Sequence, residues 1–190
     1  MFKKVFIIVS VWLGVFLFAQ GSQETANPCE LLSKQEVEQT MKIKMKEGRL
    51  RDNRSVFGDL SCKYLSVEMF EHSGSVTIDL AMTSDMKAHD AIYASAKEKY
   101  EKEKYAHLEA LKSKHKEGTF HPLPGLGDDA YWGTVSLTVL KGEYYIKIRV
   151  LAGAGIQASG KEELEKKISA KNLEISKKFA KILLKKIANL

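Results

Sequence analysis

The segment PLPGLGDDAYWG, residues 122–133, contains the residue types that come closest to a binding or catalytic motif. Gly125 and Gly127 flank a leucine, and two carboxylates, Asp128 and Asp129, follow directly. A phosphate-binding glycine loop follows a strand and opens a helix, so that backbone N–H groups and the helix dipole meet the anion. Here acidic and then strand-like residues follow the glycines, and the two carboxylates would repel a phosphate. The pattern therefore does not favour phosphate binding.

The same two carboxylates are also poorly placed for a metal ion. Calcium loops place their oxygen ligands at alternate positions, whereas these aspartates are adjacent and do not easily face one ion. Pro122, Pro124, the two glycines and an aspartate that can accept a hydrogen bond from nearby backbone are typical of a turn. Tyr131 and Trp132 favour a strand whose rings pack on the core. We interpret the segment as a turn, and we predict no metal and no cofactor.

The histidines, cysteines and serines do not form a recognisable catalytic pattern. The five histidines are His72, His89, His107, His115 and His121. They show no H-E-x-x-H motif and no i,i+4 pair, and only His115 and His121 are close enough in sequence to suggest a shared site. No serine lies in a G-x-S-x-G elbow. We therefore expect a noncatalytic protein, with a metal-dependent hydrolase assembled from distant residues as the less favoured alternative.

The first residues resemble a signal peptide. Lys3 and Lys4 precede an apolar run from Val5 to Ala19, and Ala19-Gln20-Gly21 offers small residues at a cleavage point. A membrane-spanning helix needs about 20 apolar residues, so an uncleaved anchor is the less favoured alternative. We predict a signal peptide over residues 1–21, a linker over 22–26, and a periplasmic or secreted protein. No cysteine stands at the cleavage point to carry a lipid.

Charge and cysteine usage agree with export. The chain has a formal net charge of +6, and the expected leader contains two lysines and no acid, which leaves +4. Such a small charge with both signs interspersed does not favour nucleic acid as a partner. The two cysteines, Cys29 and Cys62, most often form one disulfide in an oxidising compartment. A redox or metal pair is the alternative, but the C-x-x-C spacing is missing.

Hydrophobic spacing predicts one α+β domain over residues 27–190, in which one face of an antiparallel sheet packs against helices. Asn27 and Ser33 resemble helix caps, whereas residues 42–60 indicate no definite element. A helix is expected to start at 27–30, and further helices are expected over 34–41, 85–116 and 161–188, with a break near the charged run over 97–104 as the alternative to a continuous helix. The expected strands cover 61–67, 75–82, 134–140 and 144–151. We expect the turn over 71–74 and the turn over 141–143 to join these strands in pairs. The helices near 85–116 and 161–188 are expected to cover the same face.

Two surfaces are candidates for contact with a partner. Alternation in the last strand places Tyr145, Lys147 and Arg149 on an exposed face, which could bind another envelope protein or a small ligand, or could be an ordinary polar face. The last helix carries an apolar stripe with lysines on its other side. Such a stripe usually packs on the core. The alternative is a peripheral contact between this basic amphipathic helix and an anionic membrane.

Several motifs occur in an order that resembles a known family. Residues 27–37, NPCELLSKQEV, are similar to the opening Pro-Cys-x-Leu-Leu-(Ser/Thr)-x-x-(Asp/Glu)-Val of small bacterial exported proteins and lipoproteins classed as a domain of unknown function. Cys62 followed by Tyr64, and then Gly125 to Trp132, match later parts of that pattern. Family members are often lipid-anchored, from which this chain departs. The resemblance implies a Cys29–Cys62 bridge in a fold similar to the PsbP/Mog1-like folds, and it implies no reaction.

Overall fold

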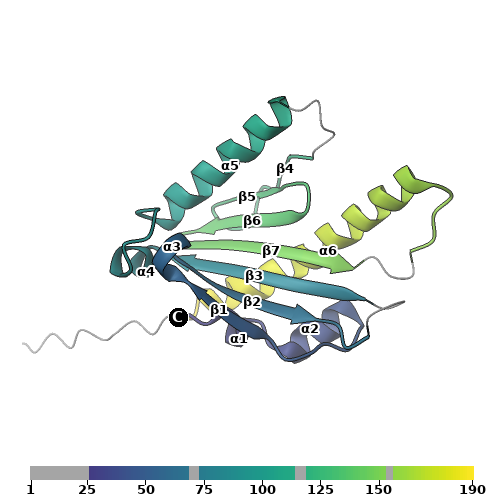
Figure 1. Cartoon of the computed structure of the whole chain (residues 1–190), viewed down its shortest axis with the longest axis horizontal. Coiled ribbons are helices and arrows are strands. Elements are labelled where there is room, and N and C mark those ends of the chain that lie inside the picture. The colour runs from purple at the N-terminus through teal and green to yellow at the C-terminus, as the bar shows by residue number, and fades with distance from the viewer. Residues whose placement is uncertain (1–25, 69–72, 114–118, 153–155) are drawn as a thin grey trace, which may run out of the picture.

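One antiparallel sheet of seven strands, in the order β1-β2-β3-β7-β6-β5-β4, forms the centre of the domain (Figure 1). The computed structural model describes residues 26–68, 73–113, 119–152 and 156–190. The strands are β1 (Arg49–Asn53), β2 (Asp59–Leu65), β3 (Gly74–Met82), β4 (His121–Pro122), β5 (Asp129–Trp132), β6 (Ser136–Lys141) and β7 (Tyr144–Ala152). The expected signal peptide over 1–21 lies outside the described residues, as do most of the linker and the start of the turn over 71–74.

Local capping signals place the first helices where the sequence predicts them. The helices in the described residues are α1 (Pro28–Leu31), α2 (Lys34–Met41), α3 (Arg54–Phe57), α4 (Thr83–Ala88), α5 (Ala96–Ser113) and α6 (Lys161–Ile187). The Asn27 side chain accepts a hydrogen bond from the Cys29 backbone N–H, and Ser33 with Glu36 forms a capping box at α2. Both predicted caps are therefore confirmed.

Helices α1, α2 and α6 cover one face of the sheet, which confirms the α+β class. In Figure 1, α6 passes behind the central strands. Alternate residues of β7 point toward it, and Ile146, Ile148 and Val150 pack in one apolar cluster with Phe179 and Leu183 of α6. The apolar stripe of the last helix is thus core, because a sheet with an apolar face needs a covering layer.

The segment predicted as helical over 85–116 differs from that prediction in two ways. The helix is interrupted after α4, and α5 starts at Ala96, where the Glu98 backbone N–H donates to Ser95 Oγ at 3.1 Å. In addition, α5 lies over the opposite face of the sheet from α6. Its Tyr100 packs with Tyr131 and Tyr145, which point away from α6 because side chains alternate along a strand. Tyr145, predicted to be exposed, is therefore fully buried.

Strand β1 was missed by the sequence analysis, which found no definite element over residues 42–60. All of its side chains are exposed or half-exposed, so they lack the alternation of apolar and polar residues that indicates a strand. Of the strands in the described residues, β1 pairs only with β2, so it forms the edge of this sheet.

The predicted disulfide between Cys29 and Cys62 is confirmed, and it joins α1 to β2 with 5.3 Å between the two Cα atoms. The Cys62 side chain is completely buried under α1. The hydroxyl of Tyr64, also on β2, donates to the Cys29 backbone oxygen at 3.1 Å and to that of Leu32. The bridge and the tyrosine therefore hold the same short helix against the sheet.

Replacing both cysteines with serine should lower the free energy of unfolding by about 3–4 kcal/mol, because the bridge closes a loop with a sequence separation of 33. Urea unfolding of residues 22–190, followed through the fluorescence of the buried Trp132, measures this difference. Wild-type protein reduced with dithiothreitol should match the double variant. Equal midpoints for the oxidised protein and the variant would contradict a stabilising bridge.

Candidate functional site

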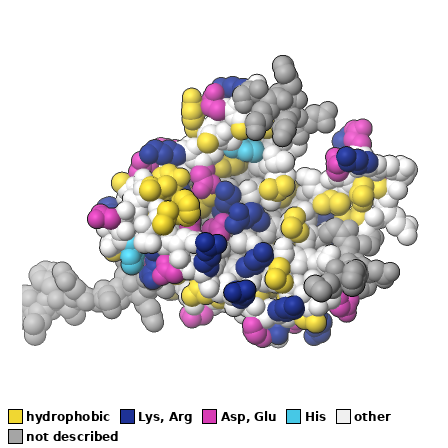
Figure 2. All heavy atoms as spheres, viewed as in Figure 1, with side chains coloured by type: hydrophobic (Ala, Val, Ile, Leu, Met, Phe, Trp, Pro, Cys, Tyr) yellow, Lys and Arg dark blue, Asp and Glu magenta, His cyan; other side chains and the backbone are white. Residues whose placement is uncertain are grey.

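A groove of about 770 Å³ crosses the part of the second face that α5 leaves open. Strands β1, β2, β3 and β7 form its floor. Its lining includes Arg49, Arg51, Ser61, Lys63, Leu65, Ser75, Thr77, Val135, Arg149 and Leu151. Figure 2 shows Lys and Arg side chains gathered across the middle of this face, with apolar side chains among them.

Strand register arranges the groove side chains in rows that run across the sheet. Arg49 lies opposite Lys63, Lys63 opposite Thr77, and Thr77 opposite Arg149, so cations from β1, β2 and β7 share one row with a hydroxyl. We call Arg49, Lys63, Thr77 and Arg149 the cationic row. Adjacent strands are about 4.8 Å apart, so the row spans about 14 Å from β1 to β7.

Within the described residues, two of the three cations in the cationic row have no carboxylate partner. In the described part of the chain, neither Arg49 nor Lys63 forms an ion pair, and the same holds for Arg51 on the next row. Arg49 and Lys63 are like charges that lie directly opposite each other on neighbouring strands. Such a pair destabilises a sheet. An anion bound between them would offset that repulsion.

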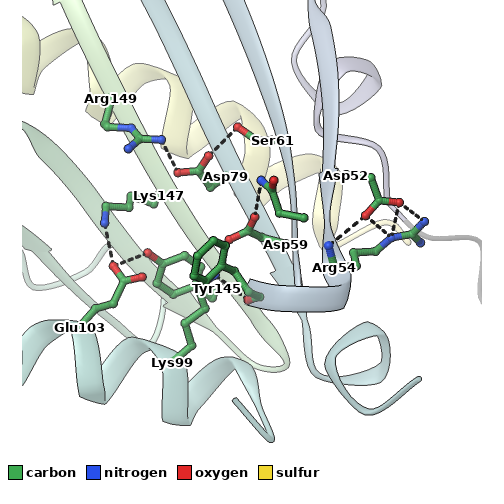
Figure 3. Close-up of polar contacts among 12 residues, drawn as sticks. Asp52, Arg54, Asp59, Ser61, Asp79, Lys99, Glu103, Tyr145, Lys147 and Arg149 are labelled. Atoms are coloured by element: carbon green, nitrogen blue, oxygen red, sulfur yellow. Dashed lines mark hydrogen bonds and ion pairs between the residues drawn. The ribbon is translucent and has the colours of Figure 1, made fainter. Parts of the chain in front are cut away.

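The third cation of the row, Arg149, forms an ion pair with an acid in the next row (Figure 3). Its Nη2 donates to Asp79 Oδ2 at 2.7 Å, while the Ser61 hydroxyl donates to Asp79 Oδ1 at 2.7 Å. Burial raises the pKa of the Asp79 carboxyl above its ordinary value, and the Arg149 guanidinium opposes that rise. Arg149 therefore stabilises the charged form of Asp79 and also borders the groove.

The helix α5 closes the other end of this face through polar contacts. Glu103 accepts hydrogen bonds from the Tyr145 hydroxyl and from Lys147 Nζ, both at 2.7 Å (Figure 3). Lys99, only 2% exposed, forms an ion pair with Asp59, and its Nζ lies 4.9 Å from the centre of the Tyr145 ring. These contacts fix α5 over the tyrosines and leave the cationic row open.

Only part of the predicted binding face of Tyr145, Lys147 and Arg149 is thus exposed. Arg149 lines the groove, Lys147 is half-buried against Glu103, and Tyr145 is covered by α5. The sequence analysis missed Arg49, Arg51 and Lys63. The available signal was the Arg-x-Arg pattern of Arg49 and Arg51, followed by Lys63 in a predicted strand. The sequence does not show the register of β1 and β2, which places Arg49 opposite Lys63.

The glycine-rich segment over 122–133 is a turn leading into β5, as interpreted from the sequence. Asp128 accepts a hydrogen bond from the Gly142 backbone N–H at 2.6 Å and pairs with Lys141 at 2.7 Å. Asp129 instead pairs with Lys104 of α5. The two carboxylates therefore join this turn to two different elements. The hydrogen bond comes from the neighbouring β6–β7 turn rather than from the segment's own backbone.

The described histidines occupy separate places. His107 of α5 stacks on Tyr131 with 6.0 Å between the ring centres, and it lies beside Phe120. His115 and His72 fall outside the described residues. Among the residues the structure describes, no group of three or more His, Cys, Asp or Glu side chains is arranged to hold a metal ion.

The basic side of α6 faces away from the groove, on the opposite side of the sheet. Several of its lysines have carboxylate partners: Lys166, Lys167, Lys178 and Lys186 pair with Glu162, Glu163, Glu174 and Glu36. Within the described ranges, no helix has the length and apolar character needed to cross a bilayer.

Comparisons with protein-family models, with curated proteins and with solved structures found no match to this chain.

Replacing Gly127 with alanine should destabilise the protein more than replacing Gly125. Both glycines have positive φ, of 72° and 80°, which costs about 1–2 kcal/mol for a residue with a side chain. A Cβ at Gly127 would also lie 2.5 Å from the Leu140 backbone oxygen, whereas nothing lies within 4 Å at Gly125. Thermal unfolding of both variants tests this order, and equal losses would contradict it.

Replacing Lys99 with methionine should cost about 3–5 kcal/mol, because Asp59 would remain buried without its partner. The matched control is Lys97→Met, which removes an exposed lysine from the same helix and should change stability by less than about 1 kcal/mol. Chemical unfolding of both variants measures the difference. Similar small losses would show that the buried pair does not hold α5 in place.

Proposed function

We propose that this protein is an exported, noncatalytic binding protein of the cell envelope, periplasmic or secreted, whose cationic row binds an anionic ligand. The single observation that carries the proposal is the row itself, in which Arg49 and Lys63 lie opposite each other without a carboxylate partner in the described residues. A concave site with a few convergent charged groups and apolar walls suits a ligand better than an ordinary polar surface does.

The walls of the groove indicate that the ligand has an apolar part as well as charge. Leu65 and Leu151 lie opposite Ser75 from either side, and they form a second row parallel to the cationic row. They are 40% and 58% exposed, so a ligand that covered them would gain from the burial of apolar surface. Carboxylate or phosphate groups would face the arginines, which bind such groups through two parallel hydrogen bonds.

Two further features support the exported location and the choice of the groove as the contact surface. The leader-like sequence over residues 1–21 is typical of export, and the disulfide is of the kind that persists in oxidising compartments. The groove is favoured over the basic side of α6 as the contact surface because many of the α6 lysines already pair with glutamates one turn away.

Replacing Arg49 and Lys63 together with serine should weaken binding of fluorescein-labelled dextran sulfate at least about tenfold, which corresponds to ~1.4 kcal/mol. The matched control, Lys171→Ser with Lys181→Ser, removes the same charge from exposed positions of α6. Asp79→Asn should instead tighten binding, because it releases Arg149 from its carboxylate partner. Fluorescence anisotropy at two salt concentrations measures all three variants.

Equal weakening in the groove variant and the α6 control would show that the probe responds to net charge alone, and it would contradict the proposal. Loss of binding in the α6 control with an unaffected groove variant would instead favour a contact through the last helix. Circular dichroism of each variant confirms that the fold is unchanged.

A further inference from the structure

The edge strand β1 is open for pairing on its outer side. Among the described residues it pairs only with β2, and the isolated bridge between Met45 and Ser66 continues the same edge toward the N-terminus. An edge strand presents unpaired backbone N–H and C=O groups along its free side. Natural sheets protect such edges with charged side chains, and here Arg49, Arg51 and Asp52 are the charges, of which Asp52 already pairs with Arg54.

We propose that β1 is the docking site for an extended acidic segment of another polypeptide, which adds to the sheet as an eighth strand. This inference rests on the proposed function, because the added strand would meet the cationic row at Arg49. Binding by strand addition draws its affinity from main-chain hydrogen bonds and its specificity from alternate side chains. The register of β1 determines which side chains those must be.

The two faces of β1 require an alternating pattern in the partner. Arg49 and Arg51 point to the groove face, so a strand paired with β1 would place its alternate side chains beside these two cations. Opposite charges at directly opposed positions stabilise a pair of strands. Leu50 lies between them on the other face and is 49% exposed, so the intervening side chain of the partner is expected to be apolar.

Charge complementarity favours an acidic strand over other occupants. A basic or neutral strand would leave Arg49 and Arg51 without carboxylates, and a second copy of β1 would bring arginine against arginine. The two arginines therefore repel basic strands and attract acidic ones. Specificity for a partner can arise from such repulsion as well as from attraction. An added strand would also extend the cationic row, so the acid beside Arg49 would reduce its repulsion with Lys63.

The test uses the mature protein and synthetic peptides labelled with fluorescein. The probe is Glu-Val-Glu-Val-Glu-Val, and its matched control, Glu-Glu-Glu-Val-Val-Val, has the same charge and composition in a pattern that cannot alternate. We expect the alternating peptide to bind at least about tenfold more tightly. N-methylation at one set of alternate residues should abolish binding, because it removes the donors that face β1, whereas methylation of the other set should be tolerated.

Variants of β1 then separate charge from backbone pairing. Arg49→Glu with Arg51→Glu should lose the glutamate peptide and gain a lysine–valine peptide of the same pattern, whereas the charge-matched control Lys171→Glu with Lys181→Glu should do neither. Hydrogen exchange of the amides over residues 49–53 should slow when the alternating peptide is bound to the wild-type protein. This exchange measurement does not depend on the stability of any variant.

Some outcomes would overturn strand addition and leave the proposed function standing. If dextran sulfate needs Arg49 and Lys63 while both peptides bind equally or not at all, the row binds anions but β1 does not add a strand. Binding of phosphatidylglycerol vesicles that is lost in Arg49→Glu with Arg51→Glu, without peptide binding, would assign the surface to lipid instead. Failure of every anionic probe would refute the proposed function and strand addition together.

Discussion

The buried ion pair between Lys99 of α5 and Asp59 of β2 joins this helix to the second face of the sheet. Removing two charges from water costs several kcal/mol for each ion, and only close geometry with further hydrogen bonds offsets that cost. Lys99 meets this condition because its Nζ also donates to the Phe57 backbone oxygen at 2.8 Å. Few positions of α5 would satisfy the same contacts, so the helix stays over one end of the sheet.

The position of α5 gives the second face a gradient of polarity. The tyrosines lie under the helix, and the next row contains Asp79 and Lys147, whose charges are paired with Arg149 and Glu103. The cationic row follows, and the leucines of the groove wall lie beyond it. The opposite face has no such gradient, since α1, α2 and α6 bury it in one apolar cluster. The larger apolar cluster therefore lies on one face of the sheet, and the groove of the proposed ligand lies on the other face of the same strands.

The features that the sequence analysis predicted correctly depend on local signals. The caps at Asn27 and Ser33, the hairpin of β6 and β7, and the final helix each follow from residues that are close in sequence. The missed features lack such signals. Strand β1 has no apolar alternation, and the dense run of lysines and glutamates over 97–104 does not indicate that Lys99 and Glu103 contact the sheet.

The sequence by itself determined the residue types: cysteines able to form a bridge, strands with one apolar face, and arginines and a lysine near the start of the domain. Only the tertiary structure decided that Arg49, Lys63 and Arg149 share one row. It also decided that Tyr145 is buried under α5. The physical reason is that strand register and helix placement are set by contacts between distant residues. A shift of one position in the register would send each of these side chains to the other face.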